Sequence, residues 1–365
     1  MSKVCLFINS LKSGGAERQL CLLASLLADN SIDVCLVTIS NSKDHYICSD
    51  KVKRKSICRD IDPRFIKVIK VFLFFFFFKG DCIISYCQRN NYYLLKSLSF
   101  RHNRPHVICS ERNFKNSPGK YERQLYYSLY PRYADYIVSN SFSQQKYITE
   151  RQPLLKSRVL TIINYLDLNY FTPKDHLYSD CLKILVTARI DRQKNCLRFI
   201  EAVAVLKKYA KKRFRVSWYG NQSFENEASV KYVREVKELI RDKGVEDIFT
   251  LYDPVSNVKD IIYSHDVMCL PSLFEGFSNS IAEGIACGKP MIVSNVSDNP
   301  IMVRTGKNGF LFDPMDIDSM VDAFNALFSL SPHQMDAMGR NSRLIAEDLF
   351  SKENFTQSYI SLIKK

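Results

Sequence analysis

The chain has 365 residues, of which 46% are hydrophobic and 25% charged, a composition that excludes a disordered protein. This length exceeds what one hydrophobic core usually serves, so two domains are predicted. The twelve cysteines and six histidines form no C-x-x-C pair and no Cys/His ligand cluster, and the short apolar N-terminal run is followed by Gly-Gly. We therefore expect a reduced cytosolic protein with no metal site and no signal peptide.

The net charge of +14 is unevenly distributed along the chain. Positions 1–170 hold 26 Lys+Arg and 13 Asp+Glu, a net +13, which leaves +1 for the remainder. A basic first half favours an anionic surface, either phospholipid headgroups or nucleic acid. No nucleic-acid-binding module is recognisable, and compositional bias is the simpler alternative.

The chain opens with the pattern of a Rossmann-like unit. Residues 3–11 form an apolar, β-rich segment, Gly14 and Gly15 follow, and residues 19–28 have helical apolar periodicity. The two glycines would let a phosphate approach the backbone beside a helix N-terminus. A tight turn without a ligand is the alternative.

After a strand at 33–40, residues 64–78 read RFIKVIKVFLFFFFF. Their apolar spacing predicts a helix, and Phe72–Phe78 is apolar all round. The apolar core is shorter than the ~20 residues that span a bilayer. The helix is either buried against the first sheet or pressed into a membrane interface with its lysines at the flank. The basic first half favours the membrane interface.

Two further strands are expected at 81–86 and 106–110. The second ends in Glu111 and Arg112, and open α/β sheets place ligand groups at such strand ends. Both are candidate site residues. The alternative is a strand-end cap and a surface ion pair.

The periodicity is interrupted near 170–180, and strand 182–187 then begins a second run of β/α units. Arg189 and Lys194 follow that strand in an R-x4-K spacing. Two cations beside a helix N-terminus suit a pyrophosphate that leaves with growing charge. Taken alone, they would be read as solvated charges.

Strand 266–270 leads into an E-x7-E arrangement, with Glu275 in a turn and Glu283 two helical turns on. The turn offers backbone N–H groups at a helix N-terminus, which suits an anion. The two carboxylates could accept hydrogen bonds from hydroxyls at the two ends of a sugar–diphosphate–ribose ligand. An isolated E-x7-E would more simply be a helix cap and a solvated glutamate.

The surrounding residues resemble the signature of the family-four glycosyltransferases: a strand, Pro-Ser, E-G-F, then E, A, G and P at fixed spacing. The matching residues are Pro271, Ser272, Glu275, Gly276, Phe277, Glu283, Ala286, Gly288 and Pro290. Residues 133–141 and 162–173 also resemble segments of this family. The resemblance implies the GT-B fold, an α/β architecture of two facing Rossmann-like domains with parallel sheets.

The resemblance also implies roles for the site residues. Glu275 would hold donor-sugar hydroxyls, Glu283 the ribose, and Arg189 and Lys194 the diphosphate. The donor-binding set is completed by the glycine-rich loop and by the turn whose amides face the sugar and diphosphate: Gly14, Gly15, Gly276, Phe277, Ser278 and Asn279. Residues 297–301 (SDNPI) depart from the family pattern.

By resemblance, residues 1–172 form the acceptor-side domain, 173–349 the nucleotide-sugar domain, and 350–365 a helix crossing back to the first. The implied activity is a retaining, metal-independent, hexosyltransferase-type transfer from a nucleotide-diphosphate sugar to a saccharide acceptor, in surface polysaccharide, O-antigen or lipopolysaccharide synthesis. We expect a lipid-linked acceptor at the inner face of the plasma membrane, an anionic membrane surface as partner, no nucleic acid and no metal cofactor. The rival functions are a nucleotide-sugar epimerase and a non-catalytic sugar-nucleotide-binding scaffold.

Overall fold

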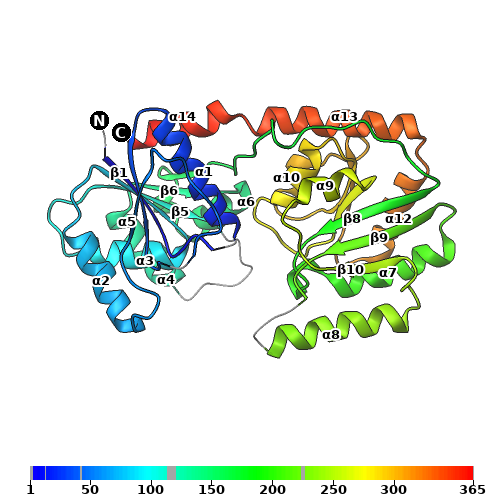
Figure 1. Ribbon diagram of the computed structural model, residues 1–365, viewed down its shortest axis with the longest axis horizontal. Helices are drawn as coiled ribbons and strands as arrows, with labels where there is room; N and C mark the ends of the chain where they lie inside the picture. Colours follow the sequence, from blue (N-terminus) through cyan, green and yellow to red (C-terminus); the bar gives the residue numbers. More distant parts are fainter. Residues whose placement is uncertain (1–2, 13, 42, 113–120, 223–226, 365) are drawn as a thin grey trace. The chain divides into compact units, whose positions relative to one another are not determined.

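The computed structural model describes residues 3–12, 14–41, 43–112, 121–222 and 227–364. The chain forms two compact units. Unit 1 consists of Met1–Tyr165 together with Ser351–Lys365, and unit 2 consists of Leu166–Phe350. Each unit contains one parallel sheet with helices on its faces (Figure 1). This confirms the predicted parallel α/β architecture.

The sheet of unit 1 has the strand order β3-β2-β1-β4-β5-β6-β7, and every pair in it is parallel. Its strands are β1 (Lys3–Ile8), β2 (Asp33–Thr38), β3 (Lys53–Ser56), β4 (Cys82–Tyr86), β5 (His106–Glu111), β6 (Tyr136–Ser139) and β7 (Val159–Thr161). Its helices are α1 (Gly15–Asp29), α2 (Arg64–Phe76), α3 (Gln88–Leu98), α4 (Glu122–Gln124), α5 (Tyr130–Tyr133), α6 (Phe142–Arg151) and α14 (Lys352–Ile363), with a π-helical turn at Leu125–Leu129.

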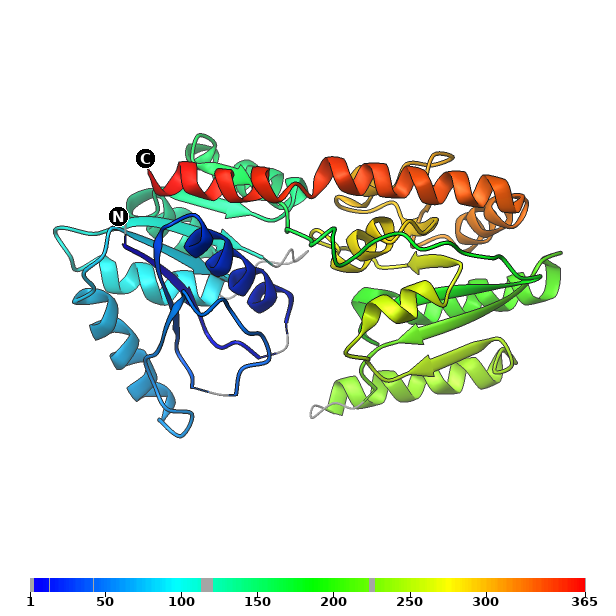
Figure 2. The ribbon, with the colours of Figure 1, turned by 45° about the horizontal axis from the view of Figure 1, so that its top comes forward.

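The central strand β1 is apolar along almost its whole length because both faces of the sheet are covered. Leu6 belongs to the hydrophobic core shared with α1 and α14, whereas Phe7 points to the opposite core with α2 and α3. The last helix of the chain therefore completes unit 1: Phe355 and Tyr359 of α14 lie buried in the same core as Leu6. Figure 2 shows α14 lying over this sheet.

The sheet of unit 2 has the order β10-β9-β8-β11-β12-β13 and is also parallel throughout. Its strands are β8 (Cys181–Thr187), β9 (Arg213–Tyr219), β10 (Phe249–Tyr252), β11 (Val267–Leu270), β12 (Met291–Ser294) and β13 (Gly309–Phe312). Its helices are α7 (Cys196–Tyr209), α8 (Glu227–Asp242), α9 (Val258–Tyr263), α10 (Asn279–Ala286), α11 (Asn299–Met302), α12 (Ile317–Phe328) and α13 (Pro332–Leu349).

A tight turn leads into the last strand of unit 2. The Gly306 N–H donates to the Gly309 carbonyl, and β13 then pairs in parallel with β12. Gly306 has a φ of +76°, which explains why a glycine stands there.

Helix α2 is attached to unit 1 by a narrow part of its surface. Val71 and Phe75 are buried, and the Phe75 ring meets Phe7 of β1 edge to face at 4.6 Å. Phe65, Ile69 and Phe77 are 66%, 53% and 69% exposed. Because so much apolar surface is left open, full burial of this helix against the sheet is excluded.

A search of the described residues finds no helix that is both long enough and apolar enough to span a membrane.

Candidate functional site

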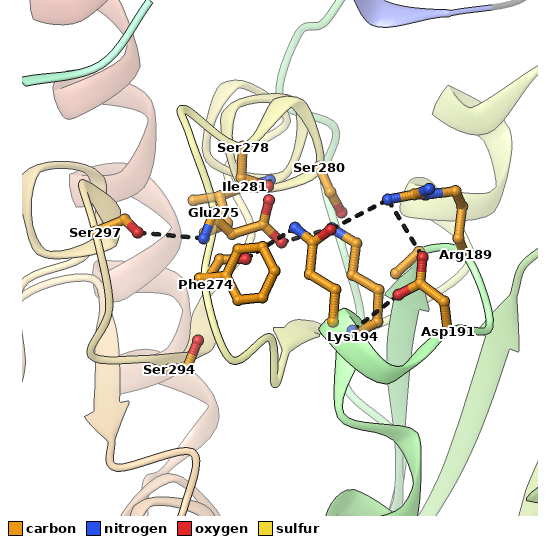
Figure 3. Close-up of polar contacts among 12 residues, drawn as sticks. Arg189, Asp191, Lys194, Phe274, Glu275, Ser278, Ser280, Ile281, Ser294 and Ser297 are labelled. Atoms are coloured by element: carbon orange, nitrogen blue, oxygen red, sulfur yellow. Dashed lines mark hydrogen bonds and ion pairs between the residues drawn. The ribbon is translucent and has the colours of Figure 1, made fainter. Parts of the chain in front are cut away.

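The candidate site of unit 2 lies where three neighbouring parallel strands end. Arg189 and Lys194 follow β8, Glu275 follows β11, and Ser297 follows β12. Because β8, β11 and β12 are adjacent, their carboxyl ends bring these loops together. Figure 3 shows the side chains converging from the three loops.

Lys194 and Glu275 form a largely buried ion pair at the centre of this site. The Lys194 Nζ–Glu275 Oε1 distance is 2.5 Å, and the two side chains are 13% and 9% exposed. Lys194 ends a single 3₁₀ turn, Arg192–Lys194, which Asp191 caps by accepting a hydrogen bond from the Lys194 N–H at 3.1 Å. Asn195 then adopts a left-handed conformation with φ +59°, so that α7 can begin in a new direction.

Gln193 joins the Lys194 loop to the Glu275 loop. Its backbone carbonyl accepts a hydrogen bond from the Leu273 N–H at 2.8 Å, and its Nε2 donates to the Phe274 carbonyl at 2.9 Å. These two bonds fix the separation of the cation and the carboxylate. Sequence reasoning missed this residue because a glutamine inside a polar loop carries no motif.

The segment that departs from the family pattern supports the site from the third side. Ser297 Oγ accepts a hydrogen bond from the Glu275 N–H at 3.2 Å. Ser297 has φ +50° and precedes the short helix α11. Within residues 297–301, Ser297 thus supports the backbone of Glu275 with its hydroxyl.

Arg189 lies beside the buried pair and is open to solvent. Its Nη2 is 3.2 Å from both Asp191 Oδ2 and Gln193 Oε1, and its side chain is 63% exposed (Figure 3). The guanidinium is held near Lys194 by these two contacts while much of its surface stays accessible. An anion arriving at the strand ends would meet this cation.

The N-terminus of α10 forms the next part of the site. Ser278 caps the helix by accepting a hydrogen bond from the Ile281 N–H at 3.4 Å. Ser280 Oγ contacts Thr187 Oγ1 of β8 at 2.5 Å, which ties this helix end to the strand that leads to Arg189. The helix dipole and its first N–H groups therefore point toward the region of the exposed cation.

The other signature residues either face a ligand only through their backbone or are buried in the interior of unit 2. The Phe277 ring is 4% exposed and meets Phe350 edge to face at 5.9 Å, so only its backbone can face a ligand. Gly276 lies in the bend before it, and Asn279 is the first residue of α10. Glu283 is 6% exposed in the middle of that helix.

Gly14 and Gly15 lie in unit 1, at the start of α1. Gly14 is the N-cap residue, and a Cβ placed on it would lie 2.1 Å from Glu17 Oε2. The absence of a side chain at Gly14 thus allows the Glu17 carboxylate to lie against the helix N-terminus. This carboxylate already meets the positive end of the helix dipole.

Glu111, the first of the two candidates after β5, is fully buried in unit 1. Its oxygens accept hydrogen bonds from Tyr130 OH at 2.7 Å, Tyr126 OH at 3.0 Å, Gln88 Nε2 at 3.0 Å and Gln144 Nε2 at 3.1 Å. Burial raises the pKa of this carboxyl above its usual range. Four neutral donors, rather than a cation, satisfy it.

Arg112 is equally internal. Its guanidinium donates to Asn164 Oδ1 at 2.9 Å, to Tyr359 OH of α14 at 2.7 Å and to Tyr86 OH, and it lies 4.0 Å from the centre of the Tyr86 ring. The alternative of a surface ion pair is therefore wrong for Glu111 and Arg112. We interpret both as structural residues of unit 1, with Arg112 holding α14 to the end of the sheet.

Within the residues that the structure describes, no group of three or more His, Cys, Asp or Glu side chains could hold a metal ion.

Comparison with known protein families gives a match within unit 2. The sequence pattern of the family described as "Glycosyl transferases group 1" matches residues 181–329. That range contains Arg189, Lys194, Glu275 and Ser297.

Relatives and solved structures extend the likeness beyond that segment. The chain is 29% identical over 132 residues to the MMP alpha-(1->4)-mannosyltransferase of Mycolicibacterium hassiacum, a match that covers 35% of this chain and 32% of that protein. It is 24% identical over 314 residues to the N-acetylgalactosamine-N,N'-diacetylbacillosaminyl-diphospho-undecaprenol 4-alpha-N-acetylgalactosaminyltransferase of Campylobacter jejuni, covering 81% of each chain.

A solved structure shares the fold over the full length. The Anabaena protein Alr3699/HepE, in complex with UDP-glucose, superposes with a TM-score of 0.79 at 17% identity, covering 100% of both chains. This likeness confirms the predicted GT-B fold.

The ion pair generates the first prediction. We expect Lys194→Met to destabilise unit 2 by about 1–3 kcal/mol, because it leaves the Glu275 carboxylate buried without its cation. Adding Glu275→Gln should recover part of that loss. Urea and thermal unfolding of the wild type, both single variants and the double variant would measure the coupling, and additive effects would contradict it.

The Arg112 contacts generate the second prediction. Arg112→Gln should loosen α14, because Tyr359 loses its charged donor, worth about 1.5–3 kcal/mol. The rate of amide hydrogen exchange should increase more in residues 352–363 than in α1. Arg123→Gln, at an exposed position in α4, is the matched control and should leave α14 protected. Unchanged exchange in the Arg112 variant would remove its assigned structural role.

Proposed function

Because the chain belongs to the glycosyl transferases group 1 family, with a GT-B fold, we propose that it transfers a sugar from a nucleotide-diphosphate sugar to a saccharide acceptor. The observation that carries the proposal is the buried Lys194–Glu275 pair beside the exposed Arg189. A sugar diphosphate needs both a cationic surface for its phosphates and a fixed carboxylate for its hydroxyls.

In this proposal the donor diphosphate lies between Arg189, Lys194 and the N-terminus of α10. The bond between the anomeric carbon and the diphosphate oxygen breaks, and negative charge grows on the leaving phosphate. Two preorganised cations and the helix N–H groups stabilise that charge. Lys194 is already held in place by Glu275 and by the Asp191-capped turn.

Glu275 positions the donor sugar. Ser297 holds its backbone and Lys194 holds its carboxylate, so the oxygens are fixed before a hexose arrives. Glu283, further along α10, takes the ribose hydroxyls, and the amides of Gly276, Phe277, Ser278 and Asn279 face the sugar and diphosphate. We propose no nucleophilic role for either carboxylate.

The acceptor hydroxyl attacks the anomeric carbon from the face that the leaving group vacates, so the configuration is retained. The departing phosphate takes the hydroxyl proton, which balances the reaction without a bound metal. Gly14 and Gly15, at the start of α1, belong to the acceptor-side unit in this proposal.

We further propose that the acceptor is lipid-linked and that unit 1 meets it at an anionic membrane surface, as a peripheral protein on the cytoplasmic side, in the synthesis of a surface polysaccharide, O-antigen or lipopolysaccharide. Helix α2 supports this proposal, because Phe65 and Ile69 on it and Phe77 directly after it are exposed. Lys67 and Lys70 lie on the same helix, but Lys67 donates to the Asp60 carbonyl at 2.8 Å and Lys70 pairs with Asp62 at 2.6 Å, so the apolar side chains carry this argument. Figures 1 and 2 both show α2 on the outside of unit 1.

The transfer reaction yields the third prediction. We expect the protein to release nucleotide from one member of a panel of UDP-, GDP- and ADP-sugars, with EDTA present and only when a membrane lipid extract supplies acceptor. Arg189→Gln and Lys194→Gln should each lower kcat/KM about 10²- to 10³-fold, the effect of removing one preorganised charge stabiliser. Glu275→Ala should abolish detectable release.

Arg192→Gln is the matched control for those variants. Arg192 belongs to the same 3₁₀ turn, but its side chain is 76% exposed and lies 3.5 Å from Glu235 rather than beside Glu275. This variant should keep activity within about threefold. Equal losses in all three cation variants would contradict the assigned roles. Donor binding without release would favour the scaffold, and conversion of the donor to an isomer would favour the epimerase.

The membrane contact yields the fourth prediction. We expect the wild type to co-sediment with vesicles that contain phosphatidylglycerol. The triple variant Phe65→Ser/Ile69→Ser/Phe77→Ser should bind these vesicles at least tenfold more weakly. Each apolar side chain that leaves water contributes about 1.5–3 kcal/mol, so three losses exceed the ~1.4 kcal/mol of a tenfold change. Met315→Ser/Leu344→Ser removes two comparably exposed apolar side chains from unit 2 and should bind normally. Indistinguishable binding by these variants would reject α2 as the contact.

A further inference from the structure

Unit 2 contains a second concave site that the proposed transfer does not use. A cavity of about 590 Å³ lies between the linker segment 173–178, residues 288–289 and one face of α13. Figure 2 shows the linker running alongside α13. Lys289 precedes β12, whereas Glu275 and Ser297 follow the carboxyl ends of their strands. The cavity is therefore at the opposite edge of the sheet from the candidate transfer site.

The walls of this cavity are held by backbone contacts. Arg343 Nη1 donates to the carbonyls of Phe171 at 2.7 Å, Ala286 at 3.0 Å and Leu168 at 3.3 Å, which ties α13 to the linker and to the end of α10. A Cβ on Gly339 would lie 2.4 Å from the Gly288 carbonyl oxygen. These contacts keep the linker and α13 at a fixed separation, so the hollow is part of the fold.

The lining carries more basic than acidic side chains. Lys174, Lys289, Arg340 and Arg343 face the two carboxylates of Asp175 and Asp336, and Arg343 is already paired with Glu347, Nε to Oε1 at 2.7 Å. Tyr178 hydrogen-bonds to Asp336, and His176 Nε2 contacts the buried Asp266. One carboxylate of the lining and the histidine beside the cavity thus already have partners within the protein.

Lys289 is the feature that points to a ligand. Its residue is 4% exposed, and its Nζ donates to the His265 carbonyl at 2.7 Å. Burial lowers the pKa of this amine to about 8, and the nearby carboxylate of Asp266, which already contacts His176, offsets only part of that effect. Buried charges in proteins are ordinarily paired.

We propose that this cavity binds a phosphate or a phosphate monoester, with Lys289 as its buried anchor and Lys174 and Arg340 closing over the anion from the linker and from α13. Phosphate oxygens accept several charge-assisted hydrogen bonds at once, which supplies the acceptors that Lys289 lacks. The volume leaves room for a sugar-sized group on the phosphate. The two carboxylates restrict the site to one phosphate group rather than a polyanion.

The fifth prediction tests this site apart from the donor site. Isothermal titration of the full-length protein with inorganic phosphate, and separately with glucose 1-phosphate, should be done in the Arg189→Gln/Lys194→Gln background. We expect binding to persist in that background, because those two residues lie at the other edge of the sheet. Adding Lys289→Gln, whose amide can still donate to the His265 carbonyl, should weaken binding at least tenfold.

Arg340→Gln provides a second variant that does not disturb the interior, because Arg340 is exposed on α13. It should weaken phosphate binding about threefold to tenfold, whereas Arg304→Gln, at another exposed position of unit 2, should bind as the parent does. Circular dichroism and Tm establish that each variant is folded. Unchanged phosphate affinity in both Lys289→Gln and Arg340→Gln, or loss of all binding in the Arg189→Gln/Lys194→Gln background, would overturn the proposal.

Discussion

The candidate site depends on one buried charge pair, Lys194 with Glu275. Each residue comes from a connection at the end of a different strand, and neither connection belongs to the sheet or to a long α-helix; Lys194 lies in a single 3₁₀ turn. The pair, together with the two Gln193 bonds, joins these connections. Because the lysine and the glutamate already hold each other in position in the free protein, they need little reorganisation to bind a ligand that carries phosphates and hydroxyls.

Unit 1 uses buried polar groups for a different purpose. Glu111 collects four neutral donors at the end of β5, and Arg112 gathers the hydroxyls of Tyr86 and Tyr359 with the amide of Asn164. These networks lie where a parallel sheet usually presents ligand groups. Here the Arg112 network binds the last helix of the chain to the first unit through Tyr359, so that α14 finishes a core begun by residues 3–8.

Helix α2 shows how little contact is needed to hold an apolar helix to a domain. Two buried side chains, Val71 and Phe75, fix it to the sheet, whereas Phe65, Val68, Ile69 and Leu73 remain exposed. The cost of exposing that surface to water is the physical reason to expect a partner on it.

The sequence determined the parallel α/β architecture, because apolar strands alternating with helical segments can bury both faces only in covered parallel sheets. It also placed Arg189, Lys194 and Glu275 in loops that follow strands, because the ends of apolar strands and the glycines and prolines after them are local signals. The tertiary structure alone decided that Gln193 and Ser297 support Glu275, since those bonds join residues 81 and 22 positions apart. It also decided that Glu111 and Arg112 face the interior and that Lys289 lines a cavity. Burial and pairing depend on which distant segments pack together, and no local pattern of residue types encodes that.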